Sequence, residues 1–455
     1  MNTVLWDNIL QFDLDNPPGE YGFSIRLADE NYWTQNFTSE AILEYKKFMY
    51  LAAISSFMVS PSEIVDIVWH QHLIFTKSYQ EFCDVLGKQV QHVPSTHNRD
   101  EHEKFLQAKN RTLQLYRSHF GEPPNSSWNY SDMYDGLHLA KAKYKTRTVI
   151  IAGLLAFALL ITPCYFLLRP LYITINNPYF ILGFLALCIA TFFCLGMINK
   201  ERLNNIIAGF DRGSFICQLA PCELIYLKTG QLPDVVHATL SELINNGAMI
   251  AHKNGYFEMS GSGSIDNIGQ LQTMNVLNGT GNISYPSLLN RLLVKPLFRN
   301  TANCMKAFKK YFTKSENFTR LFNVNLFTLL ALIMLGLVRV LTGIFRDKPV
   351  TLLVMVLAVV VFAAVLFLYR LTNITFTRLI PTLYRNELLS KSKIEENWQW
   401  EYFLWGTAAL DTSLVLAIQR TKSTEVADDG SSSCSSGGSS CGSSCSSCGG
   451  CGGGD

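Results

Sequence analysis

Four long apolar runs constrain what this chain can fold into more than any other feature of its sequence. They cover residues 148–168, 179–198, 326–345 and 350–369, and three of them contain no charged residue. A helix of about 20 residues rises about 30 Å, which matches the hydrocarbon core of a bilayer. Soluble helices of this length seldom lack a polar face. We therefore predict a mainly α, polytopic membrane protein with four transmembrane helices and the lipid bilayer as a partner.

Basic residues lie mainly on one side of the four predicted spans, which form two hairpins, 148–198 and 326–369. Cytoplasmic flanks of membrane helices carry an excess of Lys and Arg. On this rule the N-terminal region, the middle region and the C-terminal tail share the cytoplasmic side of a bacterial inner membrane. The flanking residues on that side are Lys141, Lys143, Lys145, Arg147, Lys200, Arg202, Lys306, Lys309, Lys310, Lys314, Arg320, Arg370, Arg378 and Arg385.

Arg339 is the one charged residue inside the predicted spans. It stands six residues before the end of its span, or about 9 Å along a helix. Long basic side chains near helix ends reach toward the membrane surface while their stems stay in apolar surroundings. We therefore expect Arg339 to extend to the lipid head groups. With no other charge in the spans, a transport pathway has little support.

Residues 1–140 show helical spacing and predict an all-α domain on the cytoplasmic side. Ser60, Pro61 and Glu63 have the order of a capping box with proline at the first helical position. The segments FSIRLADENYW, EYKKFMYLAA, SPSEIVDIVWHQHLIFTKSYQEFC, HVP and RTLQLYRSHFGEPP follow one another within residues 23–128. In these segments the chain resembles the glycine-rich domain-containing protein-like family. That resemblance implies a module without an established enzymatic activity.

The stretch WHQH within that module raises the question of a metal site. His70 and His72 point about 200° apart on a helix, so they cannot both bind one ion. Asp66 is four residues before His70 and can orient its imidazole, as carboxylates that hydrogen-bond to metal-bound histidines do. A site for zinc or another soft metal on His70, on His92, and on Cys83 or His72 is chemically possible. The alternatives are that the histidines belong to the core, which is the simpler interpretation, or that they form a catalytic pair.

Residues 200–324 predict a winged-helix-like α+β domain. One helix begins near Pro221, a second runs over residues 233–245, and a β-hairpin follows with Asn254 and Gly255 at its turn. The second helix carries Asp234 and Glu242 and no basic residue. Phosphate contacts supply much of the affinity of DNA-binding helices, so we expect no nucleic acid partner. The segments YPSLLNRLLVKPLF and NTANCMKAFKKYF predict basic amphipathic helices next to the third span, on the lipid surface.

The second half of the chain carries a further resemblance. The segments ELIYLKTG, ATLSELINNGAM and LVRVLTGIFRDKPVTLL precede a Gly- and Cys-rich tail. Over residues 209–455 they resemble an uncharacterised family of bacterial multi-pass membrane proteins. Its turn usually has an Arg-Gly-Arg-Pro type of sequence, and RDKP departs from that pattern. Residues 370–429 are predicted to form juxtamembrane helices.

Residues 430–455 predict a disordered tail, since 11 of these 26 residues are Ser, 9 are Gly and 5 are Cys. Cys441, Cys445, Cys448 and Cys451 have a spacing that can wrap a soft metal or an iron–sulfur cluster. The alternatives are enzymatic cyclisation of Cys and Ser, or an unmodified tail that binds proteins. Taken together, the sequence favours an interaction or scaffold protein without chemistry of its own. The alternative is a metal- or thiol-binding membrane protein.

Overall fold

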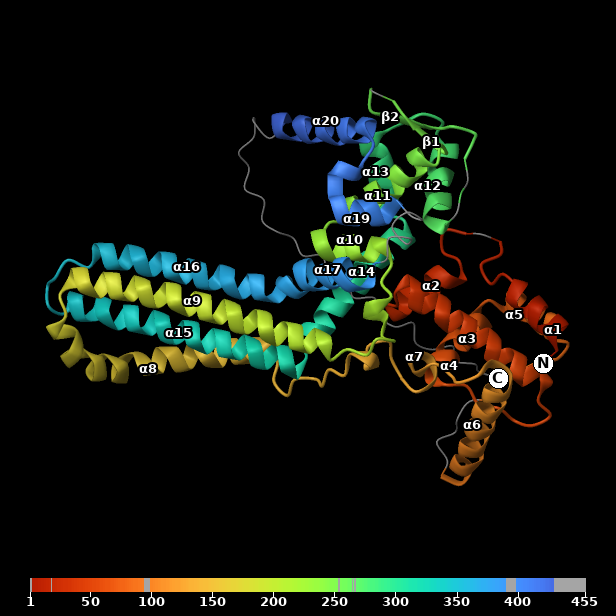
Figure 1. Cartoon of the computed structure of the whole chain (residues 1–455), viewed down its shortest axis with the longest axis horizontal. Coiled ribbons are helices and arrows are strands. Elements are labelled where there is room, and N and C mark those ends of the chain that lie inside the picture. The colour runs from red at the N-terminus through yellow and green to blue at the C-terminus, as the bar shows by residue number, and fades with distance from the viewer. Residues whose placement is uncertain are drawn as a thin grey trace, which may run out of the picture.

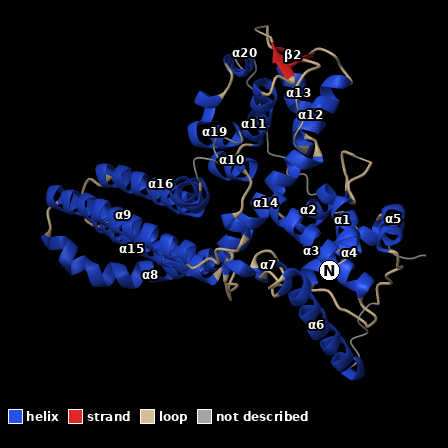
Figure 2. Cartoon of the chain, turned by 45° about the vertical axis from the view of Figure 1, so that its right-hand side comes forward, coloured by secondary structure: helices blue, strands red, loops and turns tan. Residues whose placement is uncertain are grey.

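The computed structural model describes residues 2–17, 19–93, 99–252, 254–263, 265, 267–389 and 398–428. The chain is mainly helical and forms three groups of helices (Figures 1 and 2). The N-terminal group consists of helices and one 3-10 turn. They are α1 (Thr3–Gln11), α2 (Phe23–Asn31), α3 (Gln35–Ile54), α4 (Glu63–Ile74), α5 (Thr76–Leu86), α6 (Arg99–Phe120), α7 (Asn125–Trp128) and η1 (Asp135–Leu137).

Helix α3 is the centre of the N-terminal group. It begins after Thr34, whose side chain accepts the N–H of Phe37, and it packs against α1, α2, α4 and α6. Its Glu44 is buried and accepts hydrogen bonds from Tyr116 Oη at 2.8 Å and Trp128 Nε1 at 2.7 Å. This carboxylate therefore ties α3 to α6 and α7 inside the core.

Four long helices form an arm that extends from the rest of the molecule, and successive helices of each hairpin run in opposite directions (Figure 1). They are α8 (Thr146–Thr174), α9 (Asn177–Ala208), α15 (Glu316–Ile344) and α16 (Thr351–Ile374). Each is long and apolar enough to cross a membrane and covers one of the four predicted runs to within one residue. Large side chains such as Leu159 and Leu167, which are 79% and 75% exposed, cover the outside of the arm. Such a surface suits lipid rather than water.

Helix α15 occupies the middle of this bundle. Half of its apolar stretch is buried, against 6% for α8, and it contacts α8, α9 and α16. Gly336 permits the close approach, because a Cβ there would lie 2.8 Å from Leu357 Cδ1 and 2.9 Å from Phe184 Cζ. Asn199 of α9 and Asn325 of α15 exchange two side-chain hydrogen bonds of 2.9 and 2.7 Å in the same interior.

The expectation that Arg339 extends to the lipid surface is wrong. Its side chain is only 7% exposed and lies inside the bundle. The guanidinium donates to the backbone carbonyls of Tyr172 and, at 2.8 Å, Ile175. These carbonyls belong to the last turn of α8 and the residue after it, where a helix leaves acceptors without partners. The rings of Tyr172 and Phe180 lie 5.8 and 5.0 Å from the guanidinium carbon.

The third group is a small domain of helices around a short antiparallel sheet. The predicted hairpin is present: β1 (Met249–Ala251) pairs with β2 (Tyr256–Met259), which also pairs with β3 (Ile283–Ser284). Gly255 takes a positive φ of 86° at its turn. The other elements are η2 (Phe215–Cys217), α10 (Pro221–Thr229), α11 (Leu232–Asn245), α12 (Ile268–Asn278), α13 (Tyr285–Leu293) and α14 (Pro296–Thr313).

Helix α14 packs into the protein, and its amphipathic pattern is the reason. Its apolar residues Phe298, Met305 and Phe308 are buried, and the helix contacts α2, α10 and α11. The basic, amphipathic character that suggested a helix on the lipid surface therefore serves a contact between the N-terminal group and the small domain.

The chain after the fourth membrane-length helix returns to the small domain. Helix α16 continues through π-helical η3 (Thr375–Leu379), α17 (Ile380–Leu383) and π-helical η4 (Tyr384–Leu388). Then α19 (Trp398–Trp405), η5 (Gly406–Ala409) and α20 (Thr412–Asp428) follow, and α19 packs on α10 and α11. Gln399 donates to Glu242 at 2.8 Å, and Tyr402 donates to Asp234 at 3.3 Å. Helix α19 thus covers the acidic residues of α11.

A backbone connection joins the entrances of two membrane-length helices. Ala142 N–H donates to the carbonyl of Lys314 at 2.9 Å, and Glu316 N–H donates to the carbonyl of Ala140 at 2.7 Å. These residues immediately precede or begin α8 and α15. The two helices therefore start at the same end of the bundle and run in the same direction.

Candidate metal site

Helix α4 carries the WHQH stretch, and its start differs from the predicted capping box. The capping residue is Ser62, whose hydroxyl accepts the N–H of Val65 at 3.2 Å, and the helix begins at Glu63. The cap predicted at Ser60 is therefore wrong by two residues. The Ser62 hydroxyl also donates to the Ser127 carbonyl at 2.5 Å. This second bond fixes the start of α4 against α7.

The two histidines of WHQH lie on opposite sides of α4. His72 is fully buried, whereas the side chain of His70 is 56% exposed. Trp69 is also buried, and its Nε1 donates to Tyr79 Oη at 3.1 Å. The structure thus separates a core histidine from a surface histidine within one turn of helix.

His72 has both ring nitrogens occupied. Nδ1 lies 2.8 Å from Tyr45 Oη, and Nε2 lies 3.1 Å from Ser78 Oγ. The ring also contacts Phe23 and Phe82. Burial lowers the pKa of His72 from 6.5 to about 4, so the imidazole is neutral at physiological pH. With no free nitrogen, His72 serves packing in this structure.

Asp66, His70 and His92 come together on the outer side of α4. His92 Nε2 donates to Asp66 Oδ1 at 3.0 Å, and His70 Nδ1 lies 3.3 Å from Asp66 Oδ2. The two imidazole rings are 4.3 Å apart between centroids. One ligand atom of each residue lies within 4.8 Å of the other two. Among the described residues, this is the group of His, Cys and acidic side chains that could hold a metal ion.

An extended segment after α5 positions His92. Lys88 donates to the carbonyls of Ala52 at 2.8 Å and Ser55 at 2.9 Å, which attaches the segment to the end of α3. Tyr79 donates to the carbonyl of Val90. The His92 ring then packs edge-on against Trp69, with centroids 4.6 Å apart. The core tryptophan and the surface cluster are therefore in direct contact.

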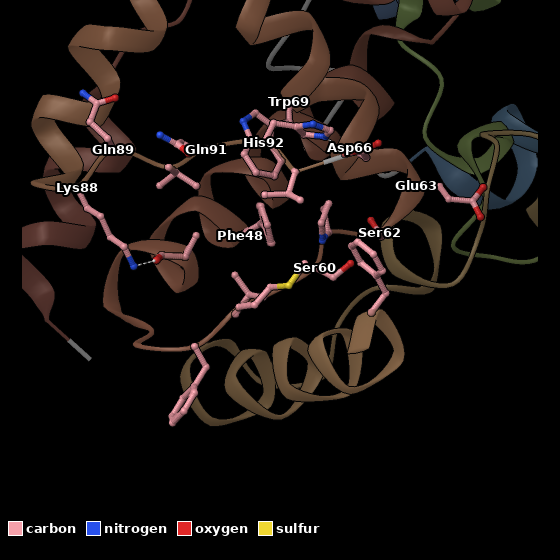
Figure 3. Close-up of a pocket in the computed structure, with 18 residues that line it drawn as sticks. Phe48, Ser60, Ser62, Glu63, Asp66, Trp69, Lys88, Gln89, Gln91 and His92 are labelled. Carbon is pink, nitrogen blue, oxygen red and sulfur yellow. Dashed lines mark hydrogen bonds and ion pairs between the residues drawn. The ribbon is translucent and has the colours of Figure 1, made fainter. Parts of the chain in front are cut away.

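A pocket of about 320 Å³ opens beside this cluster, between α3, α4, the start of α6 and the segment that carries His92. Figure 3 shows Asp66, Trp69 and His92 along one part of its wall, with Phe48 and Ser60 nearby and Lys88 at a distance. Pockets that bind small ligands typically measure about 300–1,000 Å³. A metal ion held by the cluster would therefore border a space large enough for a small ligand.

The other predicted ligands do not join this group. Cys83 is buried in α5, and the ring of His72 points into the core on the opposite side of α4. Cys441, Cys445, Cys448 and Cys451 lie outside the described residues. The structure thus brings together His70 and His92 from the predicted set and adds Asp66, which the sequence suggested only as their orienting partner.

The comparisons with known proteins support an N-terminal module. A family model described as UCP032817-like matches residues 29–114, less than half of the chain, and its description names no activity. This match lies inside the segment 23–128 that carries the first resemblance. No curated protein and no solved structure was found to match the chain. The matched residues include α4 and His92, so the candidate metal site belongs to this module.

Proposed function

We propose that this chain is a membrane-anchored metal-binding protein whose N-terminal module holds Zn²⁺ between Asp66, His70 and His92. The observation that carries this proposal is the placement of a carboxylate and two imidazoles with ligand atoms within 4.8 Å of one another. Tetrahedral zinc with bonds of about 2.0–2.1 Å keeps its ligand atoms about 3.3 Å apart. Small side-chain rotations would bring the ligand atoms from within 4.8 Å to about 3.3 Å of one another, because the exposed His70 side chain is free to turn.

Two properties of the site fit zinc better than a hard cation. Imidazole nitrogens suit zinc and similar metals, whereas Mg²⁺ and Ca²⁺ prefer oxygen ligands. Three protein ligands also leave a fourth coordination position for water or a bound molecule. That position would border the pocket lined by Asp66, Trp69 and His92.

The test is the metal content of the full-length protein after anaerobic purification in detergent. We expect about one zinc per chain, and a loss of most of it in His70→Ala and His92→Ala. His252→Ala is the matched control, because His252 is a half-exposed histidine that pairs with Glu258 in the small domain. It should keep the metal content of the unmodified protein.

A shortened chain ending at Asp429 separates this site from the tail thiols. Zinc that survives in the shortened chain and disappears in His92→Ala supports the proposal. Zinc that depends only on the tail contradicts it and favours the four cysteines predicted as ligands. Absence of metal from every version would rule out metal binding and favour the interaction role.

An interaction or scaffold function is the second candidate, and one observation favours it. Phe57 and Val93 border the same pocket and are 69% and 60% exposed. Large exposed apolar side chains beside a pocket are typical of sites that contact other proteins. On this proposal the module, like the glycine-rich domain-containing protein-like family that it resembles, performs no reaction of its own.

We further propose that both soluble groups face the cytoplasm of a bacterial inner membrane. The shared starting end of α8 and α15 supports a common side, because Lys141, Lys145, Lys314 and Arg320 gather at that end. The small domain would act as a winged-helix-like structural unit. The burial of α11 beneath α19 supports this role, since a covered helix cannot enter a DNA groove.

A further inference from the structure

A second cavity of about 590 Å³ lies between the N-terminal group and the small domain. Helices α2 and α3 form one side, and α10, α11, α12, α14 and α19 form the other. This volume falls within the range of about 300–1,000 Å³ that is typical of small-molecule sites. The cavity is separate from the pocket beside Asp66 and shares no lining residue with it.

The charge on the cavity wall is unbalanced. Among the described residues that line it, Glu223 is the single acidic side chain, and none is Lys, Arg or His. Glu223 is 2% exposed, and its two oxygens accept the backbone N–H groups of Gln35 at 2.8 Å and Ala220 at 2.7 Å. These dipoles stabilise the carboxylate without supplying a full positive charge. Burial raises the pKa of Glu223 from 4.5 to about 7.

Asn300 provides a second acceptor on the wall. It belongs to α14, is 7% exposed and lines the same cavity. Its Oδ1 has no hydrogen-bond partner within the described part of the chain. Buried side-chain oxygens are nearly always paired, so an N–H or O–H group from a bound molecule would complete this site.

The remaining wall is suited to the apolar part of a ligand. Trp33, Phe298 and Trp400 line the cavity. Aromatic rings attract organic cations as well as apolar groups. A buried carboxylate, a free amide oxygen and aromatic side chains together match a cation that has both N–H donors and a hydrocarbon portion.

We propose that this cavity binds a small primary organic amine in its ammonium form. The ammonium group donates to Asn300 Oδ1 and to Glu223, whose oxygens can each accept a further hydrogen bond. The hydrocarbon portion contacts Trp33 and Trp400. A quaternary ammonium ion lacks the N–H groups that Asn300 requires, and an anion would meet an uncompensated carboxylate. The bound amine would contact the N-terminal group and the small domain together.

The test is calorimetric titration of the full-length protein in detergent with phenethylamine at pH 8. Phenethyl alcohol is the neutral comparison of similar size. We expect saturable binding of the amine and at least about 10-fold weaker binding of the alcohol. Glu223→Gln and Asn300→Leu should each weaken amine binding about 10-fold or more.

Ser39→Ala is the matched control. Ser39 also lines the cavity, but its hydroxyl already donates to the Gln35 carbonyl at 3.1 Å, so amine binding should be unchanged. If Glu223→Gln does not fold, Asn300→Leu still tests the proposal, because it removes an oxygen that makes no hydrogen bond within the described part of the chain. The proposal is overturned if phenethylamine gives no saturable binding, if the alcohol binds as tightly, or if Asn300→Leu retains full affinity.

Discussion

Substitution of His72 by glutamine should make the N-terminal group more resistant to acid. His72 is fully buried, and both its ring nitrogens are hydrogen-bonded to hydroxyl groups. Glutamine can exchange hydrogen bonds with the same two hydroxyls, of Tyr45 and Ser78, but it does not titrate between pH 4 and 7. The variant therefore removes the proton equilibrium and retains polar partners.

The expected size follows from the pKa of His72. That pKa falls from 6.5 in the unfolded chain to about 4 in the folded one. Each pKa unit corresponds to about 1.4 kcal/mol, so the difference amounts to roughly 3 kcal/mol. Because the unfolded state binds the proton more tightly, stability is fully present above pH 6.5 and is lost as the pH falls toward 4. His72→Gln should not show this loss.

Hydrogen exchange of the α4 and α5 amides in the full-length protein can measure this effect. Opening free energies, corrected for the intrinsic pH dependence of exchange, are compared between pH 7 and 4. The unmodified chain should lose roughly 3 kcal/mol more than His72→Gln. His252→Gln, in the small domain and away from the proposed zinc ligands, should behave like the unmodified chain. An equal loss in the unmodified chain and in His72→Gln would refute the reasoning.

Two further substitutions test buried polar contacts. Glu44→Ala leaves the donors Tyr116 and Trp128 buried without an acceptor, so chemical denaturation should show a loss of about 3–5 kcal/mol, against about 1–2 kcal/mol for Tyr116→Phe. Equal losses would contradict the central role of the carboxylate. Asn325→Leu in the bundle leaves Asn199 without its partner and should lower thermal stability in detergent by about 1–2 kcal/mol. Adding Asn199→Leu should recover most of that loss. If the double variant instead loses as much stability as the two single variants added together, the pairing is disproved.

Local patterns in the sequence predicted the elements that depend on local physics. The four apolar runs match membrane-length helices to within one residue, and the hairpin around Gly255 forms where the turn residues place it. Helical geometry alone also indicated that His70 and His72 face different directions. Each of these predictions needs only the periodicity of one segment.

Apart from the cap predicted at Ser60, the errors and omissions involve partners that are distant in the sequence. Arg339 is buried because the end of α8 supplies carbonyl acceptors, and no sequence pattern around residue 339 predicts these contacts. The sequence around Glu223 gave no sign of a binding site, because the cavity that Glu223 lines forms only where α3 meets α10. Asp66 appeared as an orienting partner of His70, and its bond to His92 depends on how the segment after α5 folds back.

The backbone connection between residues 140–142 and 314–316 also bears on how the chain is inserted into a membrane. The two segments are far apart in the sequence, and the hairpin of α8 and α9 lies between them. If the two hairpins entered from opposite faces, a bilayer would separate the segments and their hydrogen bonds could not form. These hydrogen bonds can therefore form only in chains whose two hairpins have the same orientation in the membrane.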